Sequence, residues 1–170
     1  MSAWELITTA TQAVSSSSLT ANFTNVPFAD VAFFAIVFNG KAASSGQDSY
    51  CRIGTSSGVI TSSDYDVESF IISGGSSAGV SYHQETNKSF WHIENSNMGN
   101  YSSAIMYVGL DFYNSNHPLC FMKLSSETSC CQMSGWLDTS LVSLGEVQWE
   151  AGTGDVEADS YMSIYKVLSS

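Results

Sequence analysis

Apolar and polar side chains alternate with a period of two through most of the chain, and no window has the 3.6-residue period of an amphipathic helix. Successive side chains of a β-strand point to opposite faces, so this alternation indicates strands with one buried face. We therefore expect an all-β protein. The clearest strand segments are residues 4–9, 22–26, 31–39, 49–54, 68–73, 89–94, 104–113, 119–125, 131–136, 146–150 and 161–168.

Turn-forming residues separate these segments. The main groups are Asn39-Gly40, Ser56-Ser57-Gly58, Gly74-Gly75 and Gly152-Thr153-Gly154. Many short strands with such turns predict a single antiparallel β-sandwich of jelly-roll-like type. No linker, repeat or charge block divides the chain, so we expect one domain over residues 1–170.

Two segments make sharper predictions. Residues 31–38, VAFFAIVF, are apolar on both faces, which predicts a central strand with one face in the core and the other against a neighbouring element or subunit. Residues 160–170, SYMSIYKVLSS, alternate almost to the last residue. We expect this terminal strand to pair inside a sheet, with Trp4 anchoring the other end of the chain.

Charge limits the partners of the chain. Only 12% of the residues are charged, and 5 Lys and Arg face 16 Asp and Glu, for a net charge of -11. Nucleic acids and anionic lipids both need clustered cations, so we expect neither nucleic acid nor membrane as a partner. Residues 1–5 lack the basic start of a secretory signal, and no apolar run has the length of a membrane span.

The cysteines and one serine motif are not expected to carry chemistry. Cys51, Cys120, Cys130 and Cys131 lack zinc-site spacing, which favours reduced, partly buried thiols, with the adjacent pair on opposite faces of a strand. Gly75-Ser-Ser77-Ala-Gly79 matches G-x-S-x-G, but the following residues look extended instead of helical. A nucleophile elbow needs a helix there, so we expect a loop, no catalytic residue and no enzyme.

Histidines and carboxylates offer weak metal candidates. His83, His92 and His117 have no i, i+4 or H-x-H partner, so spacing predicts no zinc site. Two acidic alternations place carboxylates on one face if they lie on strands, and they are calcium candidates. An acidic strand edge that prevents aggregation is by itself a sufficient reason for them. The alternations are Asp64, Asp66, Glu68 and Asp155, Glu157, Asp159.

Four aromatic residues are candidates for a ligand-binding surface. Tyr82, Trp91, Tyr101 and Tyr113 could stack against the CH groups of sugars if they are exposed. Aromatic side chains of a β-sandwich also serve in the core and in subunit contacts, and the low surface charge favours subunit contacts.

Both ends of the chain resemble one family. The start, Ser2-Ala-Trp4-Glu5-Leu6-Ile7-Thr8, is similar to the W-E-L-I opening of small β-sandwich proteins and domains of tailed bacteriophages. The end, Ser160-Tyr-Met-Ser-Ile-Tyr-Lys166-Val, resembles their closing strand, G-T-F-S-L-Y-G. Lys166 stands where the pattern has glycine, and Asp159 stands near the glycine that precedes the last strand.

The resemblance implies a non-enzymatic virion protein without a cofactor, made in the host cytoplasm. A capsid decoration (cement) protein that stabilises the shell as a symmetric homo-oligomer, with a trimer favoured, is the preferred expectation, because 170 residues leave little room for a fibre shaft with an adaptor and a tip. Its partners would be the major capsid protein or tail proteins. The alternative is a tail or fibre module that binds a host receptor or glycan, and a lectin-like domain of a cellular organism is a third possibility.

Overall fold

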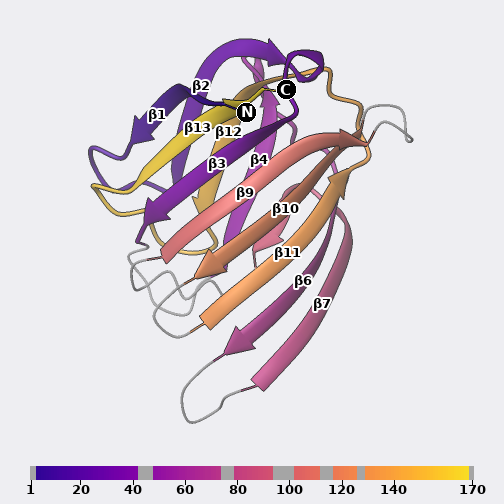
Figure 1. Cartoon of the computed structure of the whole chain (residues 1–170). Helices are drawn as coiled ribbons and strands as arrows, with labels where there is room; N and C mark the ends of the chain where they lie inside the picture. The colour runs from indigo at the N-terminus through magenta and orange to yellow at the C-terminus, as the bar shows by residue number, and fades with distance from the viewer. Residues whose placement is uncertain are drawn as a thin grey trace.

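Two antiparallel sheets lie face to face in the computed structural model, which describes residues 3–41, 48–73, 79–93, 102–111, 117–125 and 129–168 (Figure 1). The larger sheet has the spatial order β1 (Trp4–Thr11), β13 (Tyr161–Val167), β3 (Phe33–Gly40), β9 (Ser102–Asp111), β10 (His117–Ser125), β11 (Ser129–Leu137), β6 (Tyr65–Ser73) and β7 (Gly79–Lys88). The smaller sheet has the order β2 (Ser18–Pro27), β12 (Ser143–Ala151), β4 (Ser49–Thr55) and β5 (Gly58–Val59), and β8 (Trp91–Ile93) also pairs with β4. The predicted fold class, an all-β antiparallel sandwich of jelly-roll-like type, is confirmed.

The core fills the space between the two sheets. Alternate residues of adjacent strands align in rows, so that Ile36 of β3 pairs with Ile164 of β13 and with Met106 of β9, and all three are buried. Across the sandwich, the ring of Phe38 stacks on the indole of Trp149 in β12, with centroids 4.2 Å apart and planes within 2°. The period-two alternation predicted from the sequence therefore becomes one continuous apolar layer.

The doubly apolar segment is a central strand, as predicted. A short 3₁₀ helix, η1 (Phe28–Asp30), precedes it, so the strand itself begins at Phe33. Phe34 and Phe38 point into the core, while Phe33 and Val37 lie half-buried on the opposite face. That opposite face of the larger sheet is not covered by the smaller sheet.

The terminal strand also lies where the alternation predicts. β13 is an interior strand that pairs with β1 on one side and β3 on the other (Figure 1). Trp4 on β1 contacts the rings of Tyr165 and Tyr107, at centroid distances of 5.7 and 6.4 Å, but it remains 47% exposed. Both ends of the described chain are thus held in the larger sheet.

The thiols lie as expected among the described residues. The cysteines form no disulfide; Cys130 is half-buried, and Cys131 points to the opposite side, into the core. Burial raises the pKa of the Cys51 and Cys120 thiols, which keeps them protonated and unreactive. No helix in the described part of the chain is long and apolar enough to cross a bilayer.

Candidate functional site

The outer face of the larger sheet exposes a group of large apolar side chains over β6, β7 and β10. Strand register brings the four on β6 and β7 together: Phe70 pairs with Tyr82, and Ile72 pairs with Val80. The other two lie on β10, which β11 separates from β6. Each of the six is at least 41% exposed, which is unusual for so many large apolar residues on one face of a sheet. We call this group the outer apolar face; it consists of Phe70, Ile72, Val80, Tyr82, Leu119 and Phe121.

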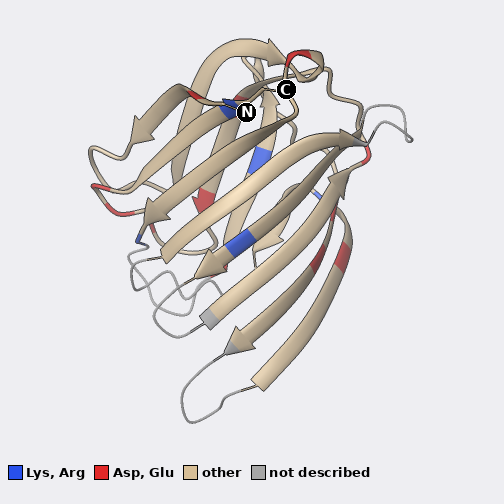
Figure 2. Cartoon of the chain, viewed as in Figure 1, with Lys and Arg blue, Asp and Glu red and all other residues tan. Residues whose placement is uncertain are grey.

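Charged side chains are sparse around the outer apolar face. Among the described residues, Glu68 on β6 and Lys123 on β10 lie beside the outer apolar face, and most of the larger sheet carries neither sign in Figure 2. Towards the middle of the sheet the apolar surface continues through Val37 and Ile105, which line a cavity of about 300 Å³ together with Lys123. The net charge of -11 is therefore carried mainly elsewhere on the molecule.

A second cavity, of about 210 Å³, lies within the outer apolar face. Phe70, Tyr82 and Phe121 line it, together with the polar side chains of Glu68 and Gln132. The rings of Phe70 and Tyr82 have their centroids 6.2 Å apart. Desolvation, with the nearby Glu68 carboxylate, raises the pKa of the Tyr82 hydroxyl, so it stays neutral. The cavity combines ring faces with hydrogen-bonding groups.

Of the four aromatic candidates, Tyr82 is exposed as predicted and Trp91 is not. Trp91 is completely buried: its Nε1 donates to the carbonyl of Trp136 at 3.2 Å, and its ring packs edge-on against Tyr65. A Cβ at Gly135 would lie 2.8 Å from that nitrogen, so the absence of a side chain there makes room for the indole. The prediction of Trp91 as a ligand-binding residue is wrong. Tyr101 and Tyr113 lie outside the described residues, as does Ser77.

The first acidic alternation does not gather its carboxylates. Asp64 precedes β6 and accepts hydrogen bonds from Ser62 and Thr139, which lower its pKa. Asp66 is buried and accepts from the backbone N–H of Asn87 at 2.6 Å, and Glu68 accepts from Gln84 on the outer surface at 3.3 Å. Each carboxylate thus has its own local partners, and they form no common ligand set.

The second acidic alternation does not lie on a strand, so the condition for a shared face is not met. Only Val156 makes a β-bridge there, with Ser16, and Asp159 has a left-handed backbone with φ of 67°. Glu157 pairs with Lys41 at 3.0 Å. The carboxylates of Asp155, Glu157 and Asp159 therefore do not share a strand face. Neither alternation forms a cation-binding group among the described residues.

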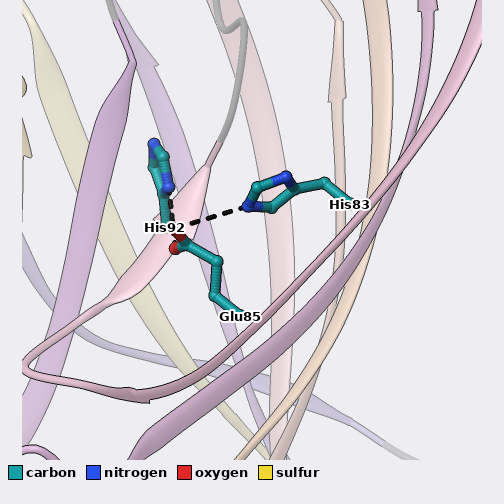
Figure 3. A group of neighbouring side chains, drawn as sticks. All are labelled: His83, Glu85 and His92. Carbon is teal, nitrogen blue, oxygen red and sulfur yellow. Dashed lines mark hydrogen bonds and ion pairs between the residues drawn. The ribbon is translucent and has the colours of Figure 1, made fainter.

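Histidines that the sequence spacing left apart meet in space. His83 and Glu85 lie on β7, and His92 lies on β8 of the other sheet (Figure 3). His83 is paired with Ser69 and Glu85 with Val67, two core-facing positions of β6, so both side chains point towards the smaller sheet. This histidine–glutamate cluster, His83, Glu85 and His92, therefore joins the edges of the two sheets.

Glu85 is the electrostatic centre of the cluster. Its Oε1 lies 3.4 Å from His83 Nε2 and 3.1 Å from Lys88 Nζ, and its Oε2 lies 2.9 Å from His92 Nδ1. Burial raises the pKa of Glu85, but hydrogen bonds from Lys88, His92 and His83 outweigh it, so the pKa lies below its usual value. The other nitrogen of the second ring, His92 Nε2, lies 3.2 Å from Asp48 Oδ2.

Comparison with known proteins gives no family. No family model matches the chain, and no curated protein matches it. The structure is similar to a legume lectin-like domain from Entamoeba histolytica, at 10% identity and a TM-score of 0.35, covering 98% of this chain and 82% of that one. It is also similar to a β-fructofuranosidase from Schwanniomyces occidentalis, at 7% identity and a TM-score of 0.25, covering 99% of this chain and 33% of that one. A third likeness is to the VP2 protein of infectious bursal disease virus, at 9% identity and a TM-score of 0.13, covering 97% of this chain and 40% of that one. At such TM-scores these likenesses assign no activity, ligand or partner to the chain.

Proposed function

We propose that this chain is a non-enzymatic structural protein of a tailed-bacteriophage virion, and specifically a decoration protein that binds the capsid shell as a symmetric homo-oligomer, with a trimer favoured. The observation that carries the proposal is the outer apolar face. Exposed apolar groups of this size on a soluble β-sandwich are typical of surfaces that become buried in an assembly.

The energetics suit attachment without chemistry. Full burial of a large apolar side chain contributes about 1.5–3 kcal/mol, so the outer apolar face offers a substantial driving force for a contact that orders few flexible side chains. A symmetric oligomer repeats this contact at each subunit, and linked contacts multiply in avidity. The resemblance of the chain ends to phage β-sandwich proteins supports the same assignment.

The first test is the copy number of the chain in purified particles, measured by quantitative mass spectrometry against the major shell protein. Hundreds of copies are expected for a decoration protein. A handful of copies would move the chain to the tail, and complete absence from particles would contradict a virion role.

A paired substitution tests whether the outer apolar face makes the contact. The double variant Phe70→Ser with Phe121→Ser is expected to lower the copy number on particles, because the contact with the shell loses the apolar area that both rings would bury. The matched control is Val14→Ser with Val142→Ser, at side chains that are 73% and 69% exposed and lie outside the larger sheet. Equal occupancy of both variants would exclude the outer apolar face as the attachment surface.

A tail module that binds a host glycan is the second candidate, and the cavity beside Tyr82 favours it. Two ring faces next to Glu68 and Gln132 match the mixed stacking and hydrogen bonding that a sugar requires. Binding of the isolated chain to a glycan array, lost in Tyr82→Ala, would favour this function over decoration. An array without any specific signal would count against it.

A further inference from the structure

We propose that His83, Glu85 and His92 bind a divalent transition-metal ion, with Zn²⁺ the best fit, and that the ion clamps β7 of the larger sheet to β8 of the smaller sheet. The proposal does not depend on a virion role. It concerns a site that residue spacing along the chain does not reveal, because the nearest histidines are on strands of different sheets.

The three side chains are already close to ligand geometry. Zinc ligands lie about 2.0–2.1 Å from the ion, so ligand atoms at tetrahedral corners are about 3.4 Å apart. In the cluster, Glu85 Oε1 is 3.4 Å from His83 Nε2, and its other oxygen, Oε2, is 2.9 Å from His92 Nδ1. One ligand atom from each residue lies within 4.8 Å of the others. Small rotations of these side chains are enough to surround an ion.

The donor set selects the class of metal. Two imidazoles with one carboxylate suit zinc and its transition-metal neighbours, whereas Ca²⁺ and Mg²⁺ take oxygen ligands. The site also has the support that metal-binding histidines usually have. With Nδ1 of His92 turned towards Glu85, its Nε2 lies 3.2 Å from the Asp48 carboxylate without forming a hydrogen bond. A small rotation of either side chain would form that bond, and a carboxylate so bonded fixes the ring of a histidine ligand and raises its basicity.

Lys88 is the competitor for the same carboxylate. Its ammonium lies 3.1 Å from Glu85 Oε1, and the side chain is 42% exposed, so it has room to move into solvent. In the absence of metal, the Lys88 ammonium compensates the negative charge of Glu85. When the ion binds, the positive charge of Lys88 opposes it, so removal of Lys88 is expected to tighten binding.

The position of the cluster indicates a structural ion. β7 is the last strand of the larger sheet and makes few contacts with β8 apart from this cluster. The side chains of Glu85 and His92 are only 15% and 13% exposed, so the ion would lie at the joint between the two sheets.

The test is a titration of the full chain with zinc alone, after treatment with a chelator, followed by isothermal calorimetry and thermal unfolding. We expect one zinc per chain and a higher unfolding temperature with zinc. His92→Asn should abolish both effects, while His117→Asn, at a histidine on β10 away from the cluster, should retain them. Zinc binding that survives His92→Asn, or no binding by the unmodified chain, would overturn the proposal.

Two further variants keep the test decisive if His92→Asn fails to fold. Asp48→Asn is expected to weaken zinc binding about 10- to 100-fold, the usual effect of losing a carboxylate behind a histidine ligand. Lys88→Gln is expected to strengthen it by up to about fivefold, the value of an exposed ion pair. A merely structural ion-pair cluster would predict no zinc affinity for any of these proteins.

Cobalt(II) bound without a thiolate charge-transfer band would exclude the cysteines as ligands, and such a band would refute the proposal.

Discussion

The hydroxyl group of Tyr65 connects the two sheets inside the core. It lies on β6, is completely buried, and accepts a hydrogen bond from the backbone N–H of Ile53 on β4 at 3.1 Å. The carbonyl oxygens of Ile53 and Ile60 both lie 3.1 Å from it and can accept its proton. Burial raises the pKa of Tyr65, so the phenol remains protonated and keeps its role as a donor.

Tyr65→Phe is therefore expected to lower the free energy of unfolding by about 1–3 kcal/mol, since the N–H of Ile53 and two carbonyls lose a partner in the core. Urea denaturation measures the change. Tyr161→Phe, at a tyrosine that is 39% exposed, serves as the control and should be close to neutral. Equal stability of the two variants would contradict a structural role for the buried hydroxyl.

Glu146, in contrast, is expected to lower the stability of the folded protein when its carboxyl group is ionised. Its carboxylate accepts a hydrogen bond from Asn22 Nδ2 at 3.0 Å, but burial raises its pKa above 4.5. The folded state therefore holds this proton more tightly than the unfolded chain, and the resulting stabilisation is lost as the pH rises through the folded-state pKa. Glu146→Gln should raise the unfolding temperature at pH 7 and have little effect at pH 4. A lower unfolding temperature at pH 7 would show that the hydrogen bond outweighs desolvation.

At the scale of elements, β13 depends on hydrogen bonds to both neighbours. Ser163 pairs with Thr9 of β1 and with Val37 of β3, and its hydroxyl lies 2.9 Å from that of Thr9. Proline at this position removes a backbone donor and distorts an interior strand, which proline normally occupies only at sheet edges. Because β13 lies between β1 and β3, it is the strand that joins β1 to the rest of the sheet.

Ser163→Ala should cost about 0.5–1.5 kcal/mol for the lost hydroxyl contact. Ser163→Pro is expected to destabilise the protein by clearly more, because it also removes a backbone hydrogen bond of the sheet and distorts an interior strand. Circular dichroism during thermal unfolding compares the two variants at one position. Similar unfolding temperatures would mean that the backbone pairing of β13 contributes little.

At the scale of the whole molecule, charge and apolar surface are separated. The chain carries a net charge of -11, yet the outer apolar face contains few charged neighbours. If this face attaches the protein to a shell, the contact gains little from ionic attraction. Salt at about 1 M reduces the screening length to about 3 Å, and we expect the contact to survive it. Copy number on particles washed at low and high salt measures this. Release at high salt would instead point to the acidic surface as the attachment site.

Sequence alternation was sufficient for the fold class because strand formation depends on local patterns. The segments around Ile164 and Trp149 alternate, and each became a strand with the predicted face in the core. β7 was absent from the predicted strands, because Val80 and Tyr82 are its only large apolar residues and the rest of Gly79–Lys88 carries little period-two signal. Its pairing with β6 makes it a strand.

Local patterns in the sequence were enough to predict the all-β class, a central strand at 31–39 and a terminal strand at 161–168, which the structure has at 33–40 and 161–167. Only the tertiary structure decided which way each edge element faces. The chain passes from one sheet to the other between β7 and β8, so Trp91 turns into the core and His92 meets Glu85. Such contacts depend on how two sheets stack and twist against each other, a long-range property that the spacing of residues along one strand does not contain.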